Sequence, residues 1–198
     1  MSAQSSVRLP GDHAPIDGRV VSFRPVSEAD LPSIMRLRSD SEVVKFWGEP
    51  PADEAAYRRE FLEEGVSPVW RFLIESGGRD IGLIQYHHAY PGTGYEWSAG
   101  VDVFIGDPGA RDGGVGTEVM RTMLQYLFET RAVHRVTIDP ETGNPRAIRC
   151  YEKAGFHLDG VLPHNAFEHG EYVDTHFMSI REDEWPAAKA RWEADAAG

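Results

Sequence analysis

The chain of 198 residues has little cysteine, no long apolar segment and few basic side chains relative to acidic ones. Its single cysteine, Cys150, excludes a disulfide within the chain and is typical of a reducing compartment. Apolar runs fall well short of the roughly 20 residues that span a membrane, so we expect no membrane partner. Because 20 Lys and Arg stand against 32 Asp and Glu, we also expect no nucleic-acid partner, which would need a cationic face.

The composition that remains is that of a folded globular protein. Hydrophobic residues make up 41% of the chain and charged residues 26%, the usual balance for a packed domain. Residues 1–18 are polar, include Pro10 and Pro15 and show no periodicity, so they predict a flexible tail. Residues 1–17 also lack the basic and apolar blocks of a signal peptide. We therefore predict a single domain over residues 19–198 and a cytoplasmic location.

The apolar pattern predicts a mixed α/β (α+β) domain. Strands are expected at 20–24, 69–74, 81–88, 95–105, 133–138, 156–161 and 172–180. Helices are expected from Ser27 through Leu37, over 52–64 and after Gly116. A further helix follows Asn144, an N-cap residue with proline behind it, and ends at Gly155. This order indicates a mainly antiparallel first half followed by a βαβ core.

A glycine-rich loop in front of a long helix is the most informative stretch. It comprises Arg111, Asp112, Gly113, Gly114, Val115, Gly116 and Thr117. Glycines bring backbone N–H groups close to a ligand, and the helix N-terminus adds unpaired donors and a positive dipole. The loop has neither the Lys-Ser/Thr of a Walker motif nor the Gly-x-Gly-x-x-Gly order of a dinucleotide fingerprint. It indicates an anion site suited to a pyrophosphate, or else a connector that only caps the helix.

Two motifs in this order resemble those of the GNAT N-acetyltransferase superfamily. Arg111, Gly114 and Gly116 resemble its acetyl-CoA pyrophosphate loop, and the segment from Asn144 to Phe156 resembles its later motif. The resemblance covers nearly all of residues 19–185. A closer likeness, to aminoglycoside 6'-N-acetyltransferases, comes from the strand at 100–108, the helix at 144–156 and the segments at 162–164 and 169–178.

The resemblance implies a GNAT fold, a mixed twisted sheet that is splayed at the cofactor site and has helices on both faces. It implies acetyl-CoA as donor and an aminoglycoside antibiotic as acceptor, with direct transfer to an amine, first of all the 6'-amine, and hence antibiotic resistance. Asp112 and Gly113 replace a commoner Gly-Lys pair, which removes a cation near the phosphates. The implied cofactor contacts are the seven residues of the glycine-rich loop together with Val103, Phe104, Ile105, Asn144, Ala147 and Tyr151.

Asp102 and Tyr151 are the candidate catalytic residues. Asp102 lies in an apolar strand sequence, where a carboxylate is costly unless it is paired. It either holds and deprotonates the acceptor ammonium, or forms a structural ion pair or loop cap. Tyr151 either packs at helical spacing or, as the resemblance implies, protonates the departing thiolate. Further candidates for the acceptor site are Trp47, Gln85, Glu96, Glu168 and Asp174, and also Tyr86 and Trp97.

Other functions remain open at this stage. The same chemistry would serve another aminoglycoside amine, such as the 2'-amine, or a lysine-type amine of a siderophore precursor. A non-catalytic acyl-CoA sensor is the rival from another class. No metal site is expected, because the adjacent His87 and His88 point to opposite faces of a strand and Cys150 has no supporting ligands. A monomer and a homodimer both fit the sequence.

Overall fold

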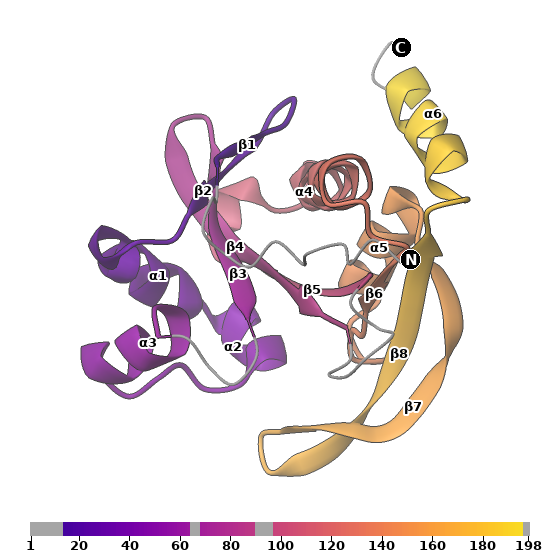
Figure 1. Cartoon of the computed structure of the whole chain (residues 1–198). Helices are drawn as coiled ribbons and strands as arrows, with labels where there is room; N and C mark the ends of the chain where they lie inside the picture. Colours follow the sequence, from indigo (N-terminus) through magenta and orange to yellow (C-terminus); the bar gives the residue numbers. More distant parts are fainter. Residues whose placement is uncertain (1–13, 64–67, 90–96, 196–198) are drawn as a thin grey trace, which may run out of the picture.

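The computed structural model describes residues 14–63, 68–89 and 97–195, which form one open sheet with helices on both faces (Figure 1). Among these residues the strands lie in the order β1-β2-β3-β4-β5-β6-β8-β7. All neighbouring strands are antiparallel except β5 and β6. The strand bounds are β1 Ile16–Asp17, β2 Ser22–Pro25, β3 Val69–Ser76, β4 Arg79–His88, β5 Ser98–Ile105, β6 Arg135–Ile138, β7 His157–Glu168 and β8 Glu171–Arg181.

Helices cover both faces of this sheet, and each face has its own apolar core. On one face lie α1 Leu31–Arg38, α2 Ser41–Trp47 and α3 Glu54–Phe61, and on the other α4 Val115–Gln125, α5 Pro145–Ala154 and α6 Trp185–Asp195. Side chains of β3 alternate between the cores, because Phe72 and Ile74 belong to one and Leu73 to the other. Short helical turns at Glu28–Asp30, Pro108–Ala110 and Tyr126–Thr130 complete these elements.

The sheet opens between β5 and β6. β5 pairs with β4 from Ala99 to Ile105, but its pairing with β6 stops at Gly100. Within the part of the chain that the structure describes, the edge of β5 that faces β6 pairs with no strand beyond Gly100. Asp102 shares a face of β5 with Phe104, which packs under α1–α3. The splayed sheet that the sequence predicts is thus present, with a carboxylate beside the opening.

The structure also corrects several expectations. Ile16–Asp17, which the sequence places in a flexible tail, forms β1 and pairs with β2, and Ile16 belongs to the core. Residues 1–13 of that tail lie outside the described residues. Two helices, α2 and α6, were not expected, and β7 is longer than predicted. Among the described residues, no helix has the length and apolar character needed to cross a membrane.

Candidate active site

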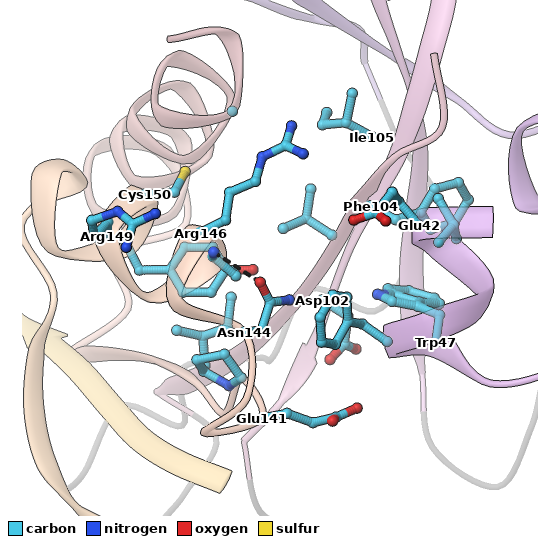
Figure 2. Close-up of a pocket in the computed structure, with 18 of the residues that line it drawn as sticks. Glu42, Trp47, Asp102, Phe104, Ile105, Glu141, Asn144, Arg146, Arg149 and Cys150 are labelled. Atoms are coloured by element: carbon cyan, nitrogen blue, oxygen red, sulfur yellow. Dashed lines mark hydrogen bonds between the residues drawn. The ribbon is translucent and has the colours of Figure 1, made fainter. Parts of the chain in front are cut away.

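The open part of β5 forms one wall of a cavity of about 870 Å³. Residues of α2 line it on one side, and the start of α4 and the length of α5 line it on the other (Figure 2). One cavity therefore brings together predicted donor and acceptor contacts from segments far apart in the chain. The predicted residues that line it are Trp47, Gln85, Asp102, Val103, Phe104, Ile105, Arg111, Asp112, Gly114, Gly116, Thr117, Asn144, Ala147, Tyr151 and Glu168.

Three predicted contacts, Gly113, Val115 and Asp174, are not among the residues that line the cavity. A carboxylate oxygen of Asp174 accepts a hydrogen bond from the backbone N–H of His164 at 2.9 Å, where the pairing of β7 with β8 is irregular. Asp174 therefore stabilises the hairpin, and the neighbouring Thr175 lines the cavity instead.

The remaining aromatic and acidic candidates also lie apart from the cavity. Tyr86 is buried in the core and stacks on Trp70 at 4.7 Å between ring centroids. Trp97 is exposed and does not line the cavity. Glu96 lies outside the described residues. Among the predicted acceptor contacts, Trp47 lines the cavity and meets the ring of Phe104 edge to face at 4.9 Å.

The glycine-rich loop presents the N-terminus of α4 to the cavity. Asp112 and Gly114 both have left-handed backbones, with φ of 66° and 81°. Gly114 is the N-cap, and no side chain of the described residues caps the first turn. Gly116 packs so closely on α5 that an added Cβ would lie 3.3 Å from Sγ of Cys150. The N–H groups of this turn are therefore left for an anionic ligand.

Arg111 contributes to this loop in a way that the sequence did not predict. Its guanidinium donates two hydrogen bonds to the backbone oxygen of Ile105, at 2.8 and 3.1 Å, and forms an ion pair with Asp40. Asp40 in turn accepts the backbone N–H of Glu42 and caps α2. Arg111 thus ties the loop to β5 and α2, and its charge is already neutralised within the protein.

Three cations on α5 supply the positive charge that the loop lacks. Arg146, Arg149 and Lys153 line the cavity at spacings of three and four residues, which place them on one side of the helix. Arg146 forms an ion pair with Asp112 at 3.4 Å, whereas Arg149 and Lys153 have no acidic partner among the described residues. These cations and the uncapped helix start fit the phosphates of a coenzyme A. The sequence analysis missed them, although their spacing was a usable signal.

Asn144 and Tyr151 belong to the same helix. Oδ1 of Asn144 accepts the backbone N–H of Ala147 at 3.1 Å, which confirms the predicted N-cap. Tyr151 is 7% exposed, lines the cavity and contacts the ring of Phe156. Burial, with smaller contributions from Cys150 and nearby carboxylates, raises the pKa of Tyr151 well above its usual range. The phenol therefore keeps its proton across the physiological pH range.

Asp102 is held by two side chains of β4. Its Oδ2 accepts a hydrogen bond from Nε2 of Gln85 at 2.9 Å and lies 3.4 Å from Nε2 of His87. Burial alone would raise the pKa of Asp102, but the contacts with His87 and Gln85 outweigh it, so this pKa lies below its usual range. His87 was not predicted as a partner of Asp102. The cross-strand register of β4 and β5, which the sequence does not show, brings the two together.

Further carboxylates gather at this end of the cavity. Asp139, Glu141 and Glu168 line it, with the cation of Lys45 near Glu141. Burial first, and then the charge of Asp102, raises the pKa of Asp139, and burial with the charge of Glu168 raises that of Glu141. Oε1 of Glu141 is buried and has no hydrogen-bond partner among the described residues. The cavity is therefore acidic at the Asp102 end and basic at the α5 end.

Comparison with known proteins assigns the family. Residues 21–157 match the model of the acetyltransferase (GNAT) domain, so the chain belongs to the GNAT acetyltransferase family. The chain is 30% identical over 157 residues to aminoglycoside N(6')-acetyltransferase type 1 of Klebsiella pneumoniae, covering 72% of this chain and 76% of the relative. It is 23% identical over 172 residues to spermidine N(1)-acetyltransferase of Escherichia coli K12, covering 84% and 89%.

Solved structures agree with this assignment. Aminoglycoside acetyltransferase AAC(6')-Ib in complex with coenzyme A and kanamycin superposes with a TM-score of 0.73 at 25% identity, covering 85% of this chain and 99% of that one. The spermidine N-acetyltransferase of Vibrio cholerae, in complex with coenzyme A and spermine, shares the fold with a TM-score of 0.68 at 23% identity, covering 83% and 97%. The chain is thus an N-acetyltransferase that uses acetyl-CoA, as the sequence predicts.

Proposed function

We propose that this acetyltransferase modifies an amine of an aminoglycoside, with the 6'-amine as the first candidate. The observation that carries the proposal is the division of charge within one cavity. Its basic end, at α5 and the start of α4, suits an anionic donor, and its acidic end, around Asp102, suits a polycationic acceptor. The relationship to an aminoglycoside N(6')-acetyltransferase supports the choice of acceptor. We place the reaction in the cytoplasm, where acetyl-CoA is made available.

The donor end would hold coenzyme A through backbone and cationic groups. N–H groups of the first turn of α4, with Arg149 and Lys153, would bind the phosphates. The edge of β5 from Val103 to Ile105 would pair with the pantetheine arm through the backbone groups that Arg111 leaves unbonded, and one backbone N–H would stabilise the oxyanion. When bound, acetyl-CoA supplies an acetyl group whose C–S bond breaks as the acceptor nitrogen bonds to the carbonyl carbon.

Side chains of the protein accept and donate the protons in this transfer. The acceptor ammonium, held beside Asp102, first loses one proton to solvent, because only the neutral amine has a lone pair for the attack. Asp102 then accepts the second proton from the nitrogen, which becomes far more acidic as the new bond forms. Tyr151 donates its phenolic proton to the sulfur as negative charge develops there. The ammonium loses two protons in all: one balances the proton gained by the thiol, and the other passes to solvent. Because donor and acceptor share one cavity, transfer is direct and proximity supplies much of the acceleration.

A polyamine is the second candidate acceptor. The carboxylates around Glu141 and Glu168 would also suit an extended dication, and one relative is a spermidine N(1)-acetyltransferase. A lysine-type amine and the 2'-amine of an aminoglycoside remain further alternatives. A non-catalytic sensor would bind coenzyme A without turnover on any amine.

The test is the release of coenzyme A thiol with a panel of amines. Kanamycin, tobramycin, gentamicin components, kasugamycin, spermidine and lysine derivatives are compared at matched concentrations. We expect turnover on the sugars with a 6'-amine and a loss of at least about 100-fold in kcat/KM for Asp102→Asn. Turnover only on spermidine or lysine derivatives would replace the proposed acceptor. No turnover on any amine, with acetyl-CoA still bound, would support a sensor.

A further inference from the structure

His87 contacts the carboxylate of Asp102, and the pairing of β4 with β5 fixes its position. In the register of β4 and β5, Gln85 lies opposite Asp102 and His87 lies opposite Gly100. The imidazole crosses over Gly100, where an added Cβ would clash with its ring and lie 2.9 Å from Nε2. Only a glycine at position 100 therefore lets the ring reach Asp102.

Hydrogen bonding defines the charge of this imidazole. Nδ1 of His87 lies 2.8 Å from the backbone oxygen of His88, and Nε2 lies 3.4 Å from Oδ2 of Asp102. A carbonyl oxygen and a carboxylate can only accept hydrogen bonds. Only a ring protonated on both nitrogens could donate to both oxygens, so the two contacts fit an imidazolium better than either neutral tautomer.

The charged groups around the ring act in the same direction. Asp102 of β5 and Asp139, which follows β6, are the acids that face His87, and both raise its pKa, Asp102 the more strongly. This outweighs burial, which alone would lower the pKa of His87. Arg71 of β3 is the other cation of the group, and it lies across β4 from Asp102, opposite Gln85. The positive charges of His87 and of Arg71 on β3 thus both offset the negative charge of Asp102.

We propose that His87, held as an imidazolium, is the positioning residue of Asp102. Gln85 and His87 both bind Oδ2, so within the described part of the chain Oδ1 is left for the acceptor amine. His87 keeps Asp102 a carboxylate next to Asp139, and it fixes the rotation that presents the free oxygen. Its role in turnover rests on the proposed function, whereas its charge state does not.

A first experiment reads the charge of His87 without any acceptor. Protein labelled with ¹⁵N-histidine is titrated by long-range ¹H–¹⁵N NMR, with His87→Gln used to assign the ring. We expect both nitrogens to be protonated at pH 7 and a His87 pKa above the ordinary 6.5, falling to 6.5 or lower in Asp102→Asn. A ring that is neutral at pH 6.5, or a titration that Asp102→Asn leaves unchanged, would overturn the proposal.

A second experiment follows the ratio of kcat/KM between wild type and His87→Gln from pH 5.5 to 9. Glutamine keeps a donor and removes the charge. The ratio cancels the titration of the acceptor amine, so a change with pH reports on the enzyme. We expect a deficit in His87→Gln that is largest at pH 5.5, roughly twofold to tenfold, because an adjacent opposite charge lowers a carboxyl pKa by about one to three units and Asp102 is partly protonated there without it. The deficit shrinks toward higher pH, as Asp102 of the variant becomes fully ionised.

The control is His88→Gln, the same change one residue along on the opposite face of β4. We expect it to follow the wild-type profile. A deficit in His87→Gln that is constant across the pH range would reveal a structural role only and would contradict the proposal. If no amine of the panel is turned over, the NMR titration still decides the charge of His87, so failure of the proposed function and failure of this inference remain distinct.

Discussion

Tyr151 is the residue on which protonation of the departing sulfur depends in this mechanism. Phenylalanine at position 151 keeps the ring that packs near Phe156 and removes only the hydroxyl. We expect Tyr151→Phe to lower kcat by about 100-fold, while KM for each substrate and the free energy of unfolding change little. Steady-state thiol release at pH 7.5 checks this. An unchanged kcat would leave Tyr151 with a packing role alone.

Glu141 is an acidic residue of the cavity with a carboxylate oxygen that could still accept a hydrogen bond. Its buried Oε1 lacks a partner among the described residues and lines the acidic end of the cavity. We expect Glu141→Gln to raise KM for a polycationic acceptor roughly threefold to tenfold at pH 8. Burial and Glu168 raise the pKa of Glu141, so the wild-type side chain loses its charge earlier than usual as pH falls. The difference in KM should therefore shrink toward acid pH.

The matched control for this change is Glu152→Gln. Glu152 is exposed on α5 and does not line the cavity, but it lies on the same helix as the cationic group. We expect its KM for the acceptor to match the wild type at each pH. Equal effects of the two substitutions would assign the result to the general charge of the protein and not to the cavity.

At the scale of single elements, α5 supplies the cationic side chains that would bind the phosphates of coenzyme A. We expect Arg149→Gln to raise KM for acetyl-CoA roughly threefold to tenfold, because a charged hydrogen bond to phosphate is lost. The effect should weaken at high salt, since the side chain is exposed. Arg59→Gln, an exposed change on α3, should leave this KM unaltered. Identical values for Arg149→Gln and wild type at low salt would remove Arg149 from the donor site.

The end of α5 depends on Gly155. Its φ is 116°, and an added Cβ would lie 2.9 Å from Ala188 of α6 and 3.1 Å from Ile180 of β8. We expect Gly155→Ala to lower the free energy of unfolding by about 1–3 kcal/mol in a urea titration. Gly160→Ala, where an added Cβ meets nothing within 4 Å, should cost far less. Equal stability of the two variants would show that the helix end can relax at no cost.

Elements with local signals were predicted well, and those that depend on packing were not. α5 begins and ends where Asn144 and Gly155 predict, because caps are local chemistry. α2 was missed, since Val43, Val44 and Phe46 favour a strand and the helix depends on the Asp40 cap and on packing under the sheet. α6 was missed although Trp185, Ala188 and Trp192 recur at helical spacing, because further alanines on the other sides of the helix weaken the contrast between its faces. β1 forms only through pairing with β2.

The residues of the candidate site also fall into two groups, those that local motifs predict and those that depend on packing. Asp102, Asn144 and five of the seven residues of the glycine-rich loop line one cavity, and their roles in binding stay a prediction. Asp174 does not line it, because an irregularity in β7 supplies an N–H that binds its carboxylate. His87 and Glu141 could not be assigned from spacing, since strand register and the turn after β6 bring them to the site.

At the scale of the whole molecule, a net charge of −12 is combined with a cationic patch inside the cavity. Coenzyme A would contact α4, α5 and β5 at the same time, so its binding should stabilise the fold. At about 100 times its Kd, the ligand adds about 2.7 kcal/mol to the free energy of unfolding. For a domain of this size we expect a rise in Tm of roughly 5–10 °C by calorimetry. A Tm that does not move would contradict the assigned donor site.

The most direct test of the proposed function compares two aminoglycosides that differ only at position 6'. One carries an amine there and the other a hydroxyl, and release of coenzyme A thiol is measured with wild type and with Asp102→Asn. We predict turnover by the wild type on the 6'-amine compound, little or none on the 6'-hydroxyl compound, and a loss of at least about 100-fold in Asp102→Asn. Equal turnover of the two compounds, or full activity of Asp102→Asn, would contradict the proposed acceptor site.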